Sequence, residues 1–291
     1  MNKNTLNNFF IPQELKNAGL NGSLTDWENN LLSHFSSSHD IFTPYPDYFK
    51  LRTYEFRVLR QLLPKYFDRQ RKYELLLEVG CNFGYKSMLL SSYAKKILAI
   101  DIPESYEGCH LGEFERTTDI AKIFVNEKMG MDQVEFKNMW PHELTIASES
   151  VDCIFTEYVL EHIPDLSKAI KEMHRVLKKD GVMIHTVPNT NDAIRVFIEA
   201  NTHITFGKLF KIFKSQMGVF LKGQSRNQSS LRLNGIVVPP CHSEHIRDFS
   251  KQLDIYTLEN YLFPMLECGL TIEHIISTRE NNHVIIVRKN Q

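Results

Sequence analysis

The sequence predicts an α/β fold whose sheet is mostly parallel and ends in an antiparallel hairpin. Short apolar runs alternate with helical stretches from residue 74 onward, a pattern typical of βαβ units. The last two apolar runs are joined by so few residues that they must pair antiparallel. Lys179-Asp180-Gly181 is a typical helix end. Strands are expected at 74–80, 95–101, 133–138, 151–158, 181–188, 270–278 and 282–289, and helices at 84–94, 117–128, 166–178 and 256–268.

The N-terminal segment and one long insertion stand apart from this alternation. Apolar residues recur at helical spacing in 24–37 and 46–67, and the second stretch is broken near Pro64. We expect these parts to cover one end of the sheet. The predicted division is a helical cap at 1–70 and a domain at 71–291 with a lid insertion at about 190–250.

Composition and charge are those of an ordinary globular chain. Of 291 residues, 42% are hydrophobic and 24% are charged, and the formal net charge is -1, so no overall field favours nucleic acid. The five cysteines are scattered and odd in number, which argues against a disulfide framework. The first residues lack the pattern of a signal peptide, and no apolar run nears the roughly 20 residues of a membrane-spanning helix. A soluble, cytoplasmic protein is expected.

A glycine loop and an acid mark a candidate cofactor site. The first strand of the predicted sheet ends at Val79, Gly80 follows at once, and Gly84 stands where a helix begins. Without a Cβ, Gly80 would let the backbone approach a ligand. Asp101 ends the next strand, about twenty residues later, where a carboxylate can accept both hydroxyl hydrogens of a ribose. Together these features indicate a cofactor that contains adenosine.

The loop sequence distinguishes among such cofactors. It lacks the GxG pair of a dinucleotide loop and the GKS/T of a Walker motif. Glu78 to Gly84 resembles the ExGxGxG motif of class I S-adenosylmethionine-dependent methyltransferases. Asn82 replaces the middle glycine, and asparagine tolerates left-handed backbone angles. The resemblance extends over roughly 74–190 and includes Leu160-Glu161-His162, as in the small-molecule enzymes with an LEH segment.

The resemblance implies a Rossmann-like, seven-stranded sheet in the order 3-2-1-4-5-7-6 with strand seven antiparallel. It also implies S-adenosylmethionine as cofactor and S-adenosylhomocysteine as product. Asn138 would face the adenine amino group, Met139 would line the ring, and the acceptor would enter near Tyr158 and Asn189. The implied cofactor residues are Glu78, Gly80, Cys81, Asn82, Gly84, Asp101, Ile102, Asn138, Met139, Glu157 and Tyr158.

Two clusters have residue types that bind metals. Glu161-His162 lies where ubiquinone-pathway O-methyltransferases and small-RNA 3′-end 2′-O-methyltransferases carry ExxEH metal ligands, but Tyr158 replaces the first Glu. Cys241 to His245 has no second ligand cluster. No bound metal is therefore expected. If a hydroxyl acceptor needs a general base, the candidates are His162, His242 and His245. We expect His185, within the fifth strand, to be a core histidine with its hydrogen bonds satisfied.

The lid is basic. Between Asn201 and Ser243 there is no Asp or Glu, and phenylalanines alternate with lysines at helical spacing over 206–223. This helix could lie on an anionic membrane, present cations to an acceptor, or pack on the domain with solvated lysines. We expect O-methylation of a small, anionic or glycan-like metabolite and no nucleic-acid partner. An RNA or protein methyltransferase, or an inactive scaffold of the same fold, is the alternative. The oligomeric state stays open.

Overall fold

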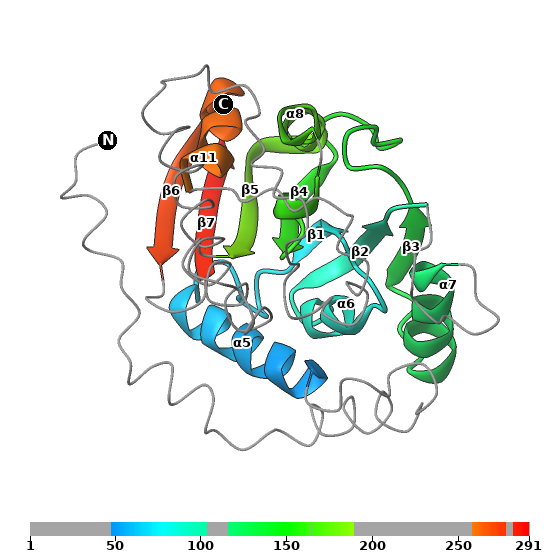
Figure 1. Cartoon of the computed structure of the whole chain (residues 1–291). Coiled ribbons are helices and arrows are strands. Elements are labelled where there is room, and N and C mark those ends of the chain that lie inside the picture. Colours follow the sequence, from blue (N-terminus) through cyan, green and yellow to red (C-terminus); the bar gives the residue numbers. More distant parts are fainter. Residues whose placement is uncertain (1–47, 104–115, 164, 189–257, 278–281, 291) are drawn as a thin grey trace, which may run out of the picture.

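The computed structural model describes residues 48–103, 116–163, 165–188, 258–277 and 282–290 (Figure 1). Its strands form one seven-stranded sheet in the order β3-β2-β1-β4-β5-β7-β6. Neighbouring strands from β3 to β5 are parallel, whereas β7 is antiparallel to both β5 and β6. The predicted sheet and its strand order are therefore confirmed. The strands are β1 (Tyr73–Val79), β2 (Ala94–Asp101), β3 (Val134–Asn138), β4 (Val151–Glu157), β5 (Leu177–Pro188), β6 (Leu270–Ser277) and β7 (Asn282–Lys289).

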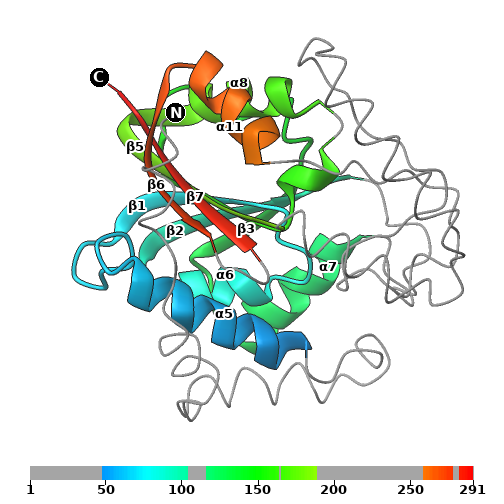
Figure 2. The ribbon, with the colours of Figure 1, turned by 60° about the vertical axis from the view of Figure 1, so that its left-hand side comes forward.

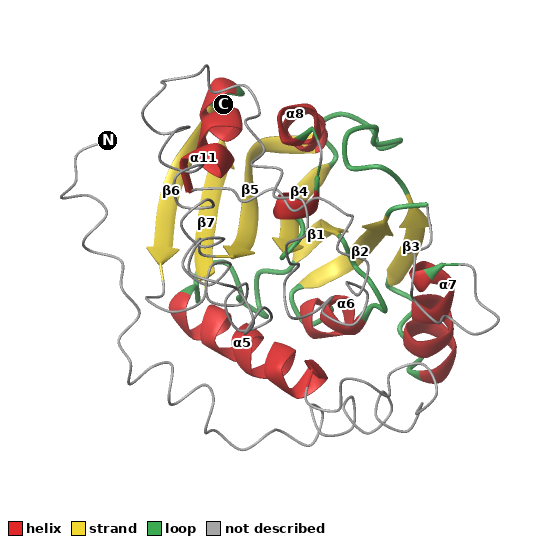
Figure 3. Cartoon of the chain, in the orientation of Figure 1, coloured by secondary structure: helices red, strands yellow, loops and turns green. Residues whose placement is uncertain are grey.

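Helices cover both faces of the sheet (Figures 2 and 3). One face carries α5 (Tyr48–Leu62), α6 (Tyr85–Leu90) and α7 (Thr117–Ala121), which continues into the π-helix η1 (Lys122–Lys128). The other face carries the 3-10 helix η2 (Leu160–His162), α8 (Leu166–Val176) and α11 (Leu258–Glu267). Within the described residues, no helix is long and apolar enough to cross a bilayer.

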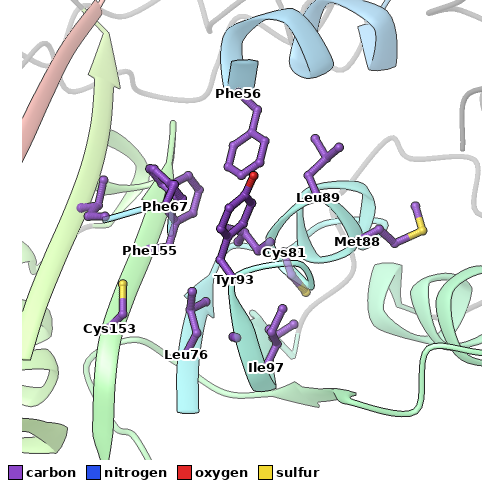
Figure 4. Packing of buried hydrophobic residues seen from close by; sticks show 14 of the residues in the cluster. Phe56, Phe67, Leu76, Cys81, Met88, Leu89, Tyr93, Ile97, Cys153 and Phe155 are labelled. Carbon is purple, nitrogen blue, oxygen red and sulfur yellow. The ribbon is translucent and has the colours of Figure 1, made fainter. Parts of the chain in front are cut away.

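Alternation along the strands divides the core between these two layers. In β1, Leu76 packs toward the side of α5 and α6, and Leu77 packs toward the side of α8 and α11. Three rings hold α5 against the sheet layer: Phe56, Phe67 and Tyr93 make edge-to-face contacts with centroids 5.4 to 6.0 Å apart (Figure 4). Helix α5, predicted as part of an N-terminal cap, thus belongs to the hydrophobic core. The helix expected at 24–37 and the lid at 190–250 lie outside the described residues.

Two helix ends differ from the prediction. The helix expected over 84–94 ends at Leu90, because a turn is needed before β2 starts at Ala94. The helix expected over 166–178 ends at Val176, and Leu177 already pairs with Val151 of β4. The predicted stop at 179–181 instead forms an irregularity inside β5, after which the ladder resumes. The turn-forming residues therefore mark a bulge in a strand rather than the end of a helix.

His185 is buried as expected, but only one of its ring nitrogens is satisfied. Its Nδ1 lies 2.9 Å from the hydroxyl of Thr156, whereas Nε2 has no hydrogen-bond partner among the described residues. Complete burial lowers the pKa of His185 to about 3, so the ring is neutral at physiological pH. The prediction of a core histidine is confirmed, and the prediction that all its hydrogen bonds are satisfied is wrong for the described structure.

Candidate functional site

The candidate site lies where the order of the strands reverses. From β1 the chain continues outward through β2 and β3, and then returns to β4 on the opposite side of β1. The loops that follow β1 and β4 therefore meet at the same edge of the sheet, the usual place for a ligand in an open α/β fold. They are in direct contact, because the side chain of Val159 occupies the space that a Cβ on Gly80 would need.

The glycine loop has the left-handed backbone that its sequence predicts. The φ angles of Gly80, Asn82 and Gly84 are 78°, 48° and 78°, so asparagine does adopt the conformation expected of the missing glycine. The missing Cβ atoms also leave room for neighbouring side chains. Val159 fills the space at Gly80, and a Cβ on Gly84 would lie 2.8 Å from the Phe136 side chain. Both glycines allow close packing of the loop and the start of α6.

Hydrogen bonds to the Asp101 side chain join this loop to the end of β2. The residue is 4% exposed. Its carboxylate Oδ2 accepts the N–H of Asn82 at 2.7 Å, and Oδ1 accepts the N–H of Ile102 at 2.8 Å. Carboxylate oxygens have further lone pairs for ligand hydroxyls. The side-chain oxygen of Asn82 is buried without a hydrogen-bond partner among the described residues. Cys81, predicted beside the cofactor, is buried in the same loop. The site thus offers acceptors to a ligand that donates, as a ribose does.

The predicted adenine residues lie beside Asp101. Asn138 pairs with Asp101 in the β2–β3 register, and its side-chain oxygen accepts the hydroxyl hydrogen of Thr118 at 3.0 Å. The next residue, Met139, is buried and donates its N–H to the backbone oxygen of Asp101 at 2.9 Å. The structure therefore brings Asp101, Asn138 and Met139 together, as the predicted adenosine site would need.

Glu78 is buried at the end of β1. The hydroxyl of Ser87, in α6, donates to its Oε2 at 2.5 Å, so the contact seen is with the helix rather than with the loop backbone. The pKa of Glu78 is raised to about 8, mainly by burial. The hydrogen bond from Ser87 and the charge of Lys86 oppose this rise, and the charges of Glu157 and Asp101 add to it. The group is poised to change its charge near neutral pH.

A buried ion pair at this site was not predicted from the sequence. Lys86 Nζ lies 2.9 Å from Glu157 Oε1, and both side chains are about one-tenth exposed or less. The ammonium also lies 5.2 Å from the centroid of the Phe56 ring. The one feature of the sequence that could have indicated this pair is the lysine in the mainly apolar helix α6. Glu157 therefore directs its carboxylate to α6.

Tyr158 connects β4 to α5. Its φ angle is 55°, and its N–H donates to the backbone oxygen of Thr186 at 2.9 Å. Its phenol donates to Oε1 of Glu55 at 3.2 Å. Glu55 has no place in the sequence motifs, and its position 103 residues earlier in the chain gave no signal.

The described residues do not show the histidine side chains that were predicted as candidate bases. His162 ends η2, and nothing is described of its side chain. His242, His245 and Asn189 lie outside the described residues. Within 48–103, 116–163, 165–188, 258–277 and 282–290, no group of three His, Cys, Asp or Glu residues could hold a metal ion.

Comparison with known proteins identifies the family. A family model described as a methyltransferase domain matches residues 51–239, well over half of the chain. The chain belongs to this methyltransferase family.

The methyltransferase is similar to characterised and uncharacterised relatives over part of their length. It is 27% identical to a probable S-adenosylmethionine-dependent methyltransferase of Mycobacterium tuberculosis (strain CDC 1551 / Oshkosh), over 48% of this chain and 44% of that protein. It is 25% identical to malonyl-[acyl-carrier protein] O-methyltransferase of Methylovorus sp. (strain MP688), over 46% of this chain and 45% of that protein. The chain thus spans less than half the length of these curated relatives. The crystal structure of the PH0226 protein from Pyrococcus horikoshii OT3 has the same fold, with a TM-score of 0.55 and 16% identity. The match covers 86% of this chain and 98% of that chain.

In the methyltransferase without ligand, Glu78→Gln is expected to change how stability depends on pH. Between its ordinary pKa of 4.5 and the raised value of about 8, Glu78 keeps its proton when folded and loses it when unfolded. Raising the pH from 5 to 8 therefore destabilises the wild type relative to the variant, by about 1 kcal/mol per pH unit. Urea unfolding midpoints at pH 5, 6, 7 and 8 measure the difference.

Glu273→Gln is the control for this titration. The Arg288 guanidinium lowers the pKa of Glu273 to about 2, so that group is ionised in both states throughout the range. Its substitution should shift the whole curve by a constant amount. If the stability of the wild type and of Glu78→Gln changed with pH in the same way, Glu78 would already be ionised at pH 5 in the folded protein, and the prediction would be wrong.

Lys86→Met is expected to destabilise the methyltransferase by about 3 kcal/mol or more, because it leaves the Glu157 carboxylate buried without its ammonium partner. The double variant Lys86→Met/Glu157→Gln should recover most of this loss. The exposed pair of Lys95 and Glu74, 2.5 Å apart, is the matched control: Lys95→Met should cost less than about 1 kcal/mol. Chemical unfolding of the four proteins makes the comparison, and equal costs for both lysines would contradict it.

Proposed function

We propose that this methyltransferase binds S-adenosylmethionine at the ends of β1 and β2 and transfers its methyl group to a hydroxyl oxygen of a small molecule. The observation that carries the proposal is the double hydrogen bond of Asp101 to the N–H groups of Asn82 and Ile102. It joins the glycine loop to an acid at the end of the neighbouring strand, an arrangement that suits a ribose.

The described residues fit this cofactor. Asp101 would hold the ribose, and Asn138 and Met139 would hold the adenine. When bound, the cofactor supplies an electrophilic methyl group on a cationic sulfonium. Among the described residues, the carboxylates of Asp101 and Glu157 lie at this site together with the ammonium of Lys86. A negative balance of charge favours a cationic ligand.

The proposed acceptor follows from a named relative and from the LEH segment. A relative is named malonyl-[acyl-carrier protein] O-methyltransferase, and the LEH segment 160–162 suggests the small-molecule subgroup. We propose a small, anionic or glycan-like hydroxyl compound that enters near Tyr158 and Asn189. The lid helix at 206–223 would present cations to it or touch a membrane surface. We also propose a cytoplasmic location and a reaction without metal.

Transfer of labelled methyl tests this function. The protein is incubated with S-[methyl-¹³C]adenosylmethionine and, separately, 3,4-dihydroxybenzoate, glucose 6-phosphate, a uridine diphosphate sugar, an aliphatic amine, transfer RNA and a protein extract. Mass spectrometry should find the label on oxygen in one of the hydroxyl compounds, and EDTA should not prevent this. Label only in the amine, RNA or protein would overturn the acceptor class. No binding of S-adenosylmethionine by calorimetry would overturn the enzyme and favour a scaffold.

A further inference from the structure

The contact between Tyr158 and Glu55 is held in an unusual conformation. An aromatic residue with φ of 55° lies in the left-handed region, where side chains other than glycine are strained. The hydrogen bond from the Tyr158 N–H to Thr186 and the bond from its phenol to Glu55 keep it there. Strain maintained in this way is concentrated at functional positions. The phenol is therefore fixed at a defined point rather than placed by chance.

Tyr158 belongs to the edge at which the candidate site lies. It directly follows the last residue of β4, and its neighbour Val159 packs into the space at Gly80. Tyr158 is thus part of the loop that touches the glycine loop, and its phenol reaches Glu55 in α5. A ligand bound between the ends of β1 and β4 would meet Tyr158 next to it.

The carboxyl groups at this edge have contacts of different kinds. Glu78 accepts the hydroxyl of Ser87, Asp101 accepts two backbone N–H groups, and Glu157 is paired with Lys86. Glu55 accepts a hydrogen bond from a phenol, whose oxygen both donates and accepts. A carboxylate that receives a phenol hydrogen bond can take a proton through that phenol from a third group.

We propose that Tyr158 is the catalytic residue that receives the proton of the acceptor hydroxyl, and that Glu55 is the positioning residue that orients the phenol and takes its proton. The inference rests on the proposed transfer of methyl from S-adenosylmethionine to oxygen. As the acceptor oxygen attacks, its bond to the methyl carbon forms and the sulfur–methyl bond breaks with its electron pair left on sulfur. The hydroxyl proton moves to the phenol oxygen while the phenol proton moves to Glu55. The sulfonium charge and the carboxylate charge disappear together, so the step is balanced.

The relay predicts a specific pattern of kinetic effects. Tyr158→Phe and Glu55→Gln should each lower kcat about 100-fold for the hydroxyl compound methylated in the transfer assay, with KM changed less than about threefold. The double variant should be no slower than either single variant, since both residues serve one step. Glu55→Asp should recover part of the loss. Binding of S-adenosylhomocysteine, measured by calorimetry, should be unchanged in Glu55→Gln and Glu55→Asp.

Tyr66→Phe is a matched control. Its phenol also donates to a glutamate, Glu273 of β6, which is paired with Arg288 of β7. Arg288 lies opposite Val182 in the β5–β7 register, away from the end of β4. This variant should keep the kcat of the wild type. A comparable fall in Tyr66→Phe would assign the effect to general loss of stability and would overturn the relay.

A spectroscopic measurement tests the pair without turnover. Tyrosine labelled with ¹³C at Cζ is incorporated, and the Tyr158 resonance is assigned from its loss in Tyr158→Phe. Glu55→Gln should shift this resonance, and Tyr66→Phe should not. An unshifted resonance, or full kcat in Tyr158→Phe, overturns the relay while leaving the proposed function intact. Absence of methyl transfer by the wild type to any hydroxyl compound contradicts the proposed function itself, even where the resonance shifts.

Discussion

Replacing Asp101 with alanine is expected to weaken the binding of S-adenosylmethionine at least 100-fold. The substitution removes a buried carboxylate that would accept two ribose hydroxyls, and hydrogen bonds to a charged group are each worth about 1.5–3 kcal/mol. It also removes the acceptors for the N–H groups of Asn82 and Ile102, which loosens the glycine loop. A hundredfold loss corresponds to about 2.7 kcal/mol. Isothermal titration with S-adenosylmethionine and S-adenosylhomocysteine measures it.

Asp152 supplies the control for this variant. Its Oδ2 accepts the N–H of Leu75 at 2.8 Å, and its Oδ1 lies 2.7 Å from Lys178 Nζ. It therefore also joins neighbouring strands through a backbone N–H, but at the opposite end of β4 from the candidate site. Asp152→Asn should bind both ligands as the wild type does. Wild-type affinity in Asp101→Ala would show that the cofactor does not use the end of β2.

Gly80→Ala is expected to destabilise the protein by about 3 kcal/mol and to abolish cofactor binding. A left-handed residue with a Cβ costs about 1–2 kcal/mol, and forcing a methyl group into packed space costs about 1–3 kcal/mol more. Both costs apply, because φ is +78° and the new Cβ would overlap the side chain of Val159. Chemical unfolding gives the stability, and titration calorimetry gives the affinity.

Gly130→Ala separates the two costs. Gly130 has a similar φ of +65°, but no atom lies within 4 Å of the position of a new Cβ. Its substitution should cost only about 1–2 kcal/mol. Gly80→Ala combined with Val159→Ala should regain the steric part of the loss. If Gly80→Ala cost no more than Gly130→Ala, the packing of Val159 against the glycine loop would be contradicted.

Much of the fold could be predicted because local patterns carry it. The apolar runs that become β1 to β7 are short enough to be strands, and the few residues between β6 and β7 allow only an antiparallel pair. The spacing from the glycine loop to Asp101 also follows from one strand–helix–strand unit. The order of the strands came from the family resemblance rather than from the pattern. The extent of β5 was missed, because residues 178–181 form a bulge that resembles a helix end.

Within the candidate site, the sequence was sufficient to predict the residues that belong to one motif, such as Gly80, Asn82 and Asp101. Their roles depend on backbone angles and strand ends, which are local properties. It was not sufficient for contacts between distant segments. Lys86 meets Glu157, and Tyr158 meets Glu55 across 103 residues, only because α5 and α6 pack on the same face beside the end of β4. Folding also adds a second reason for glycine at position 80, because the tertiary structure places the side chain of Val159 in the space that a Cβ would need.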